Sequence, residues 1–271
     1  MRLVIRHQTS YRYSTPIAYA IQALRLTPRA YEGLNIIRWR VRGEARYELP
    51  SFIDGYGNLV HCHTVNRMHD SAVVVVEGEV ETHVTDGIVR GAAETLPPLF
   101  YLRSTRLTAI DPAIEALARA CGGNPFERLM ALMEAVRARV DYRAGVTQAT
   151  TTAAEALQGG AGVCQDHAHV FIAGARAMGV PARYVGGYLW AGGDDENQAS
   201  HAWAEAYLQE FGWIGFDPSN RTRPSEAYVR ASIGLDYWSA APVRGVRRGD
   251  GEESLAVNVR VKESAQQQQQ Q

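Results

Sequence analysis

The sequence predicts an α+β protein, in which an N-terminal antiparallel β domain is followed by a core with a central helix packed against an antiparallel sheet. Three observations lead to this fold class. Residues 1–90 alternate apolar and polar side chains with the period of two that half-buried strands show. Pro97 and Pro98 then interrupt the pattern, because neither fits a central strand or a helix interior. Helical periodicity follows between residues 111 and 179, and further strand patterns come after it.

The first third of the chain is predicted to form strands rich in β-branched and aromatic residues, at residues 3–13, 35–43, 59–65 and 71–84. Turn signals separate them at Asp54-Gly55, Gly57-Asn58 and Asp86-Gly87. No helical stretch in this region is long enough to supply the crossovers of a parallel sheet. We therefore assign residues 1–95 to an antiparallel β domain and favour a sandwich.

Residues 105–248 are assigned to the core. Asp111 is placed to cap a helix that has Pro112 at its first position and ends at Gly122-Gly123. An amphipathic helix is predicted over residues 126–142 and a buried helix over 163–179, and strands are predicted at 182–190, 200–208 and 213–220. In residues 249–271 we expect a closing strand and then a Gln tract, which has no apolar side chains to pack and is expected to be disordered.

Composition and charge exclude several classes of protein. The 271 residues include 28 basic and 29 acidic side chains, so no strong field attracts nucleic acid or an anionic membrane surface. The longest aliphatic run, residues 73–76, is far shorter than the roughly 20 residues that span a bilayer. The N-terminus lacks the apolar region of a secretory signal, and three scattered cysteines indicate reduced thiols. We expect a cytoplasmic protein that needs no cofactor, and no oligomeric state is indicated.

Cys164 is the strongest candidate for a reactive side chain. It follows a Gly-rich loop, residues 159–162, and begins the predicted buried helix. The free N–H groups and the positive dipole end of a helix start stabilise a thiolate there. The backbone N–H of the same residue can also donate to an oxyanion. This position therefore predicts an activated nucleophile.

His201 and Asp217 are the candidates for the partners of that nucleophile. Amide cleavage by a thiolate needs a general acid for the departing amine, and a histidine is suited to that exchange near neutral pH. His201 begins one predicted strand, and a turn near residue 210 leads into the returning strand. This register places Asp217 opposite Trp203 and one diagonal step from His201, so that the carboxylate can orient the imidazole. Pro218 ends the ladder at that point.

Three blocks of sequence together resemble the bacterial transglutaminase-like superfamily: GVCQDHAHVFIAGARAMGVPARYVGGYL, SHAWAEAYL and GWIGFDPSN, at residues 162–189, 200–208 and 212–220. The resemblance implies a papain-like fold with Cys164 as nucleophile, His201 as general base and acid, and Asp217 as the residue that orients the imidazole. LRLTPR and DGYGN, at residues 24–29 and 54–58, resemble the β domain that precedes the core in these bacterial proteins.

Other contacts with the substrate are indicated less directly. Animal transglutaminases use a Trp at the oxyanion, but this chain has no Trp between residues 40 and 189. Gln158, six residues before Cys164, has the spacing of the papain oxyanion glutamine and is our candidate for that role. Tyr188 and Trp203 are candidates for substrate contacts, with core packing as the alternative.

Polar residues in the first turns of the buried helix also have structural interpretations. Gln165 and Asp166 are expected to cap the helix or to complement its dipole, and Asp166 can also hold a loop. His167 and His169 are two residues apart on a helix and point about 200° apart, so they cannot share a metal ion. At least one of them is expected to pack in the core.

The main hypothesis is a cysteine enzyme that attacks a peptide or isopeptide amide of a peptide or protein substrate, forms a thioester, and favours hydrolysis over cross-linking. An alternative is a non-catalytic peptide-binding or assembly module on the same scaffold. A third is a metalloprotein that uses His61 and His63, which share a strand face around Cys62. No second half of such a site is evident in the sequence, so no metal is assigned.

Overall fold

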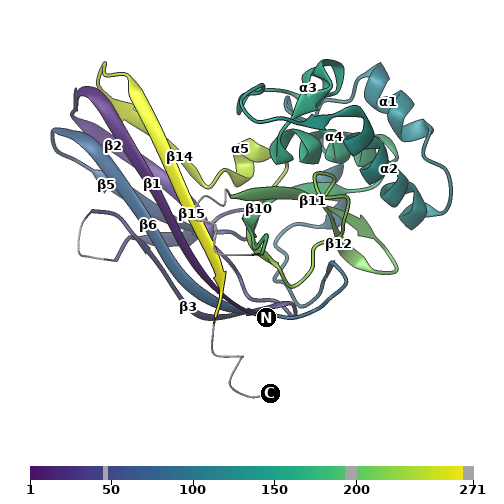
Figure 1. Cartoon of the computed structure of the whole chain (residues 1–271), viewed down its shortest axis with the longest axis horizontal. Helices are drawn as coiled ribbons and strands as arrows, with labels where there is room; N and C mark the ends of the chain where they lie inside the picture. The colour runs from purple at the N-terminus through teal and green to yellow at the C-terminus, as the bar shows by residue number, and fades with distance from the viewer. Residues whose placement is uncertain (45–47, 193–199, 265–271) are drawn as a thin grey trace.

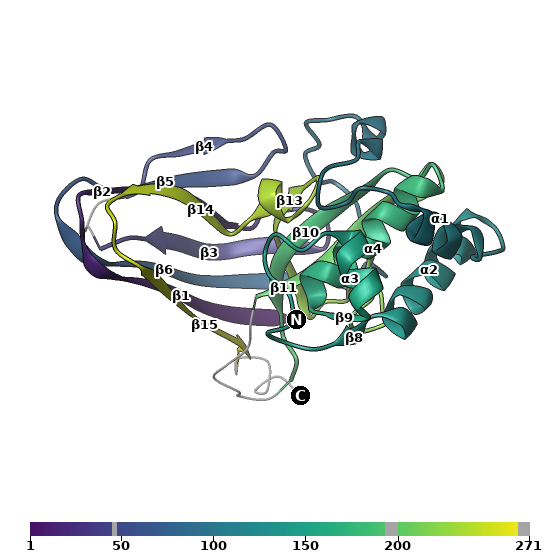
Figure 2. The ribbon, with the colours of Figure 1, turned by 90° about the horizontal axis from the view of Figure 1, so that it is seen from above.

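The computed structural model describes residues 1–44, 48–192 and 200–264. A β sandwich, built mainly from the N-terminal third of the chain, lies beside an α+β core built from the middle of the chain (Figures 1 and 2). This arrangement confirms the predicted fold class. The Gln tract at the C-terminus lies outside the described residues.

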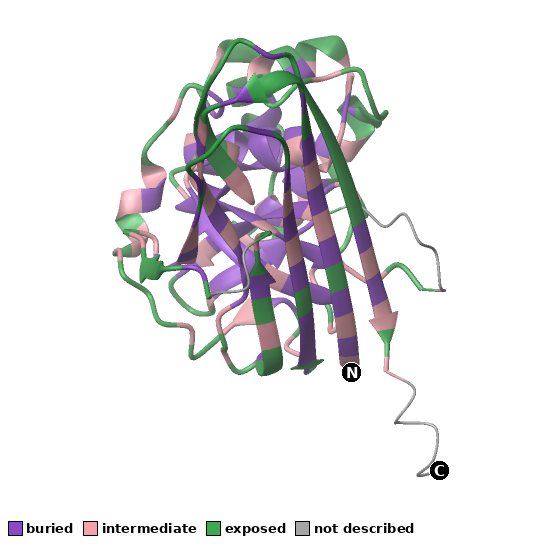
Figure 3. Ribbon diagram, turned by 90° about the vertical axis from the view of Figure 1, so that its left-hand side faces the viewer, coloured by how far each residue is buried: buried purple, intermediate pink, exposed green. Residues whose placement is uncertain are grey.

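Each sheet of the sandwich has four strands. One sheet has the order β15 (Glu253–Glu263), β1 (Arg2–Ile17), β6 (His69–Thr82) and β3 (Leu34–Arg42), and the other has the order β14 (Val243–Arg248), β2 (Tyr19–Thr27), β5 (Leu59–Val65) and β4 (Ser51–Ile53). Along β1, buried Leu3 and Ile5 alternate with more exposed neighbours, as the period of two predicts, and Figure 3 shows this alternation in colour. The apolar faces of the two sheets form the interior of the sandwich.

The two C-terminal strands complete the sandwich. β15 pairs with β1 from Leu3 opposite Glu263 to Tyr13 opposite Glu253, and β14 pairs with β2 (Figure 1). Residues 243–248 thus lie in the sandwich, although the domain boundaries predicted from the sequence place them in the core. The short strand β7 (Ile88–Val89) falls within the predicted β domain of residues 1–95, but it pairs with β12 of the core sheet. Local periodicity identifies a strand but not its distant partner, which explains both differences.

The core sheet has the order β13 (Tyr228–Gly234), β10 (Ala182–Leu189), β11 (His201–Leu208), β12 (Gly212–Phe216) and β7. Tyr207 pairs with Trp213, and Ala204 pairs with Phe216. This register agrees with the one predicted from the short turn, and Asp217 follows directly after the last paired residue. A separate parallel pair joins β8 (Asp141–Tyr142) to β9 (Ala161–Gly162).

The helices of the core cover one face of this sheet. They are α1 (Pro112–Arg119), α2 (Pro125–Arg139), α3 (Ala153–Gly159), α4 (Cys164–Ala177) and the short α5 (Tyr237–Ala240), with a 3-10 turn at η1 (Pro98–Leu102) where the sequence analysis expects a linker. The Asp111 side chain accepts a hydrogen bond from the Ile114 N–H and caps α1 as predicted. α3 is not among the predicted helices, and residues 141–142 form β8 rather than the end of α2.

α4 is the central helix, and every residue from Asp166 to Arg176 is buried. It packs between β10 and β11 on one side and α1, α2 and α3 on the other. No helix within the described ranges is long and apolar enough to cross a bilayer.

Candidate active site

Cys164 is the first residue of α4, and Asp166 determines how the chain enters that helix. The Asp166 carboxylate accepts the Val163 N–H at 2.8 Å and the Thr147 hydroxyl at 2.6 Å. It therefore caps α4 and holds the 147 loop, as the sequence predicts. A Cβ on Gly162 would lie 2.7 Å from the Asp166 side chain, so this close approach requires glycine.

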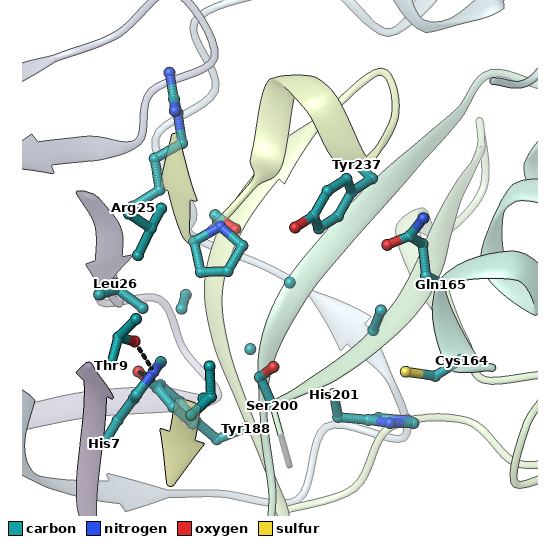
Figure 4. Close-up of a pocket in the computed structure, with 18 of the residues that line it drawn as sticks. His7, Thr9, Arg25, Leu26, Cys164, Gln165, Tyr188, Ser200, His201 and Tyr237 are labelled. Carbon is teal, nitrogen blue, oxygen red and sulfur yellow. Dashed lines mark hydrogen bonds between the residues drawn. The ribbon is translucent and has the colours of Figure 1, made fainter. Parts of the chain in front are cut away.

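His201 and Asp217 come together at the open end of the β11–β12 hairpin. His201 is the first residue of β11, and Asp217 follows β12 directly. The distance from His201 Nε2 to Asp217 Oδ2 is 2.7 Å, and the Asp217 side chain is fully buried. This contact leaves Nδ1 as the ring nitrogen that is free to meet Cys164. Figure 4 shows the sulfur of Cys164 next to the imidazole of His201.

Three further residues donate hydrogen bonds to the Asp217 carboxylate. The Tyr228 hydroxyl donates to it at 2.8 Å, the Asn220 side-chain amide at 2.7 Å, and the Ser219 backbone N–H at 3.0 Å. Burial alone would raise the pKa of Asp217, but the hydrogen bonds and the charge of His201 hold this pKa below its usual value. The carboxylate is therefore ionised although it is inside the protein.

Neither Tyr228 nor Asn220 is among the site residues predicted from the sequence. Asn220 lies three residues after Asp217, where Asn and Asp side chains commonly bond to nearby groups in turns, so a local signal was present. Tyr228 is the first residue of β13, which β10 and β11 separate from β12 in the core sheet. Its contact with Asp217 therefore depends on the order of the strands in the sheet.

The surroundings of His201 favour the imidazolium. Burial alone would lower the pKa of His201, but its hydrogen bonds to Asp217 and Cys164, together with their negative charges, raise this pKa to about 10. At neutral pH the site can therefore hold an imidazolium between the Asp217 carboxylate and the sulfur of Cys164. This is the charge distribution that a cysteine nucleophile with a ready proton donor requires.

The other predicted site residues lie in three different places. Trp203 is buried and stacks on the His201 ring at a centroid distance of 6.2 Å, so it supports the imidazole from behind. Tyr188 is also buried, but it lines the pocket that opens at Cys164. Gln158 is on α3 with its side chain exposed, and it is not among the residues that line this pocket. The structure does not bring Gln158 to the sulfur, because α3 ends and the chain turns through Gly160 in between.

The histidines of α4 have structural roles. His167 hydrogen-bonds to Ser219 and to the Val140 carbonyl, and His169 accepts the Tyr237 N–H. Burial lowers the pKa of both rings. These contacts agree with the packing role predicted from their spacing.

A metal site at His61 and His63 finds no support in the geometry. The His63 ring is buried against Gln22, with a hydrogen bond of 3.0 Å. In the described part of the chain, no group of three or more His, Cys, Asp and Glu side chains is placed to hold a metal ion.

Two family models match the sequence. Residues 115–218 match the transglutaminase-like superfamily, and residues 3–81 match the bacterial transglutaminase-like N-terminal region. An uncharacterized protein of Mycobacterium leprae is 30% identical over 275 residues, which cover 96% of this chain and 98% of that protein. An uncharacterized protein of Mycobacterium tuberculosis is 28% identical over 282 residues, which cover 94% and 90%.

A solved structure shares the fold of the whole chain. It is a protein from Cytophaga hutchinsonii described as a "Putative Cysteine Protease", with a TM-score of 0.77 and 24% sequence identity. The match covers 97% of this chain and 91% of the other, so the sandwich and the core occur together in both proteins.

Proposed function

Because the chain belongs to the transglutaminase-like superfamily, we propose that it is a cysteine acyl-transfer enzyme that acts on peptide or isopeptide amides and hydrolyses them in preference to cross-linking them. Cys164, His201 and Asp217 would carry the reaction. The observation that supports this most strongly is the 2.7 Å hydrogen bond between His201 and Asp217, beside a cysteine at the start of a buried helix.

Acylation of the enzyme follows from the charges of these groups. The Cys164 thiolate adds to the amide carbonyl carbon, while the backbone N–H at the start of α4 offers a hydrogen bond to the oxygen that becomes negative. The His201 imidazolium then gives its Nδ1 proton to the amine nitrogen as the C–N bond breaks. The amine leaves, and a thioester remains on Cys164.

Deacylation reverses the role of the imidazole. Neutral His201 takes a proton from a water molecule as the water oxygen attacks the thioester carbonyl. The C–S bond breaks, a carboxylic acid leaves, and the thiolate and imidazolium are restored. Throughout, the Asp217 carboxylate accepts a hydrogen bond from the Nε2–H group and keeps Nδ1 directed at the sulfur.

The preference for hydrolysis rests on similarity to a solved structure. The description of the Cytophaga hutchinsonii protein quoted above favours water over an amine as the acyl acceptor. Hydrolysis, deamidation and amine coupling share the same thioester. They differ only in which amide is attacked and in whether water or an amine cleaves the thioester, so one experiment can compare all three.

The proposal is tested by incubating the full chain with a peptide library, with and without an added primary amine, and by reading the products by mass spectrometry. We expect new peptide ends in both conditions, with coupled amine as the minor product. Cys164→Ser should abolish all products, whereas the matched Cys62→Ser, in the sandwich, should leave them unchanged. Products that persist in Cys164→Ser would refute the assignment.

Alkylation with iodoacetamide separates the enzyme from a non-catalytic peptide-binding module. Selective labelling of Cys164 that persists in mild acid and weakens in His201→Ala supports the enzyme. Equal, slow labelling of Cys62, Cys121 and Cys164 would support the module instead.

A further inference from the structure

The pocket that opens at Cys164 is built by both halves of the molecule. One side comes from the start of α4, from β10, β11 and β13, and from α5. The other comes from the sandwich and the segment leading into it: His7, Thr9, Tyr11, Arg25, Leu26, Pro242, Val243, Leu255 and Val257. Figure 4 shows His7, Thr9 and Leu26 across this space from Cys164, Gln165 and His201. The core therefore does not enclose the pocket by itself.

The sandwich wall is held in place on the core. The Asn58 side chain donates to the Ile233 carbonyl and accepts the Ile233 N–H, each at 2.8 Å, and Asn58 is 4% exposed. The Thr82 hydroxyl donates to the Glu226 carbonyl at 2.6 Å. These bonds link sandwich loops and strands to β13 and its approach, so the wall has a defined position relative to Cys164.

Two apolar side chains of this wall are unusually exposed. Leu255 is 57% exposed and Val257 is 50% exposed, although they lie on the same face of β15 as Val259 and Val261, which are 1% exposed each. Val259 and Val261 pack with Leu3 and other residues of the sandwich and core. Further along the strand the same face has no such cover and lines the pocket, so an apolar group placed there would remove both side chains from water.

The histidine and the arginine that the sandwich contributes to the lining are paired with neighbouring side chains. His7 hydrogen-bonds to the Tyr188 hydroxyl at 3.0 Å and to Thr9 at 2.9 Å, and burial lowers the pKa of His7 to about 4, so this ring is neutral near pH 7. Arg25 Nε pairs with Asp54 Oδ2 at 2.9 Å, and Arg25 Nη1 is buried without a hydrogen-bond partner. Figure 4 shows this guanidinium pointing away from Cys164. Apart from the Cys164–His201 pair, the described lining residues offer no uncompensated charge to a ligand. A charged substrate side chain would lose its water there without gaining a partner.

The volume limits what the pocket can hold. It is about 270 Å³, which is just below the range of roughly 300–1,000 Å³ that is usual for sites of drug-sized ligands. This is room for one large side chain with part of its main chain.

We propose that this pocket, between the sandwich and the start of α4, is the specificity site for one large, uncharged apolar side chain of the amide substrate, with Leu255 and Val257 as its wall. The inference rests on the proposed function, because it takes Cys164 as the reacting group. It gives the β sandwich a direct part in substrate selection.

The test measures how well small amides protect Cys164 of the full chain from iodoacetamide. In the labelling reaction the thiolate forms a C–S bond and iodide leaves, so no turnover is needed. The protecting compounds are N-acetyl-phenylalanine amide, N-acetyl-aspartic acid α-amide with its side-chain carboxylate free, and N-acetyl-lysine amide. We expect the phenylalanine compound to slow labelling several-fold at concentrations at which the two charged compounds do not.

Two neighbouring variants on β15 provide the matched comparison. Leu255→Asp places a charge in the wall, and we expect about tenfold weaker protection by the phenylalanine compound. Ala256→Asp places the same charge on the opposite, solvent-facing side of the strand and should protect like the wild type. Thermal melting checks that both variants fold, and Leu255→Thr replaces Leu255→Asp if that variant does not.

The two proposals fail in different ways. If iodoacetamide does not label Cys164 faster than Cys62 and Cys121, the activated thiol and the proposed function are wrong. If Cys164 is labelled selectively but the charged amides protect as well as the phenylalanine compound, the apolar specificity site alone is wrong. Equal loss of protection in Leu255→Asp and Ala256→Asp would also overturn it.

Discussion

Replacing Asp217 by Asn tests the electrostatic basis of the site directly. The substitution keeps the size of the side chain, removes the negative charge, and replaces the carboxylate that accepts from His201 Nε2 at 2.7 Å. The pKa of His201 is raised from 6.5 to about 10 against the effect of burial, and the hydrogen bond to Asp217 makes the largest contribution that raises it. Since each tenfold change in protonation is worth about 1.4 kcal/mol, the raised pKa corresponds to roughly 5 kcal/mol in favour of the imidazolium.

The sign of the effect follows from the direction of that pKa. Because the folded chain holds the His201 proton more tightly than a free histidine does, the imidazolium is present below a pH of about 10 and is lost above it. In Asp217→Asn the pKa should fall to neutral or below, since burial then acts against a weaker attraction. The thiolate of Cys164 would lose its counter-ion at neutral pH, and turnover should fall by several powers of ten, on the order of 10⁴ for the equivalent change in a serine protease triad.

Two measurements check this prediction. The first is the NMR titration of the His201 ring protons, and the second is the rate of Cys164 alkylation across pH. Asp111→Asn is a suitable control, because Asn caps a helix as well as Asp does and α1 begins far from the site in sequence. If His201 still titrates near pH 10 in Asp217→Asn and the alkylation profile is unchanged, the reasoning is refuted.

Three further predictions concern stability and the neighbours of the site. Burial lowers the pKa of His169 from 6.5 to about 4, so between these two pH values the unfolded chain binds a proton that the folded chain does not. The free energy of unfolding, measured with urea, should therefore fall by roughly 3 kcal/mol as the pH is lowered from 6.5 to 4. An equally steep fall in His169→Gln would contradict this. Arg183→Met leaves buried Glu205 with Arg230 as its remaining ionic partner and should cost about 3 kcal/mol in urea unfolding; a loss too small to measure would contradict this. Tyr228→Phe removes one donor to Asp217 and should slow Cys164 alkylation several-fold with little change in melting temperature, and an unchanged rate would rule out a role for this hydroxyl.

Local features of the sequence account for much of the scaffold around the site. The capping of α1 by Asp111 and of α4 by Asp166 depends on residues within three positions of the helix start. The pairing of β11 with β12 depends on a short turn, which permits few registers, and Tyr207 opposite Trp213 agrees with the predicted one. Such contacts close small loops, and they can therefore be predicted from the sequence.

Contacts between segments that are distant in the chain could not be predicted from the sequence. Tyr228 reaches Asp217 because β13 and β12 belong to one sheet, and Leu255 reaches the pocket because β15 pairs with β1. Gln158 has a suggestive spacing, yet α3 and the turn at Gly160 leave its side chain exposed. The number of residues between two positions is a poor guide to their distance in space when a turn with positive φ lies between them.

The sequence by itself determined α1, α2 and α4 but not α3, the alternation of buried and exposed residues along β1, the start of the helix at Cys164, and the hairpin that carries His201 and Asp217. Only the tertiary structure decided that the last two strands close the sandwich, that Tyr228 joins the carboxylate, and that the sandwich supplies one wall of the pocket. The physical reason is that periodicity and capping act over a few residues. The partner of a strand edge or an apolar face is instead selected among all such surfaces in the chain, by burial that exists only after the whole chain has folded.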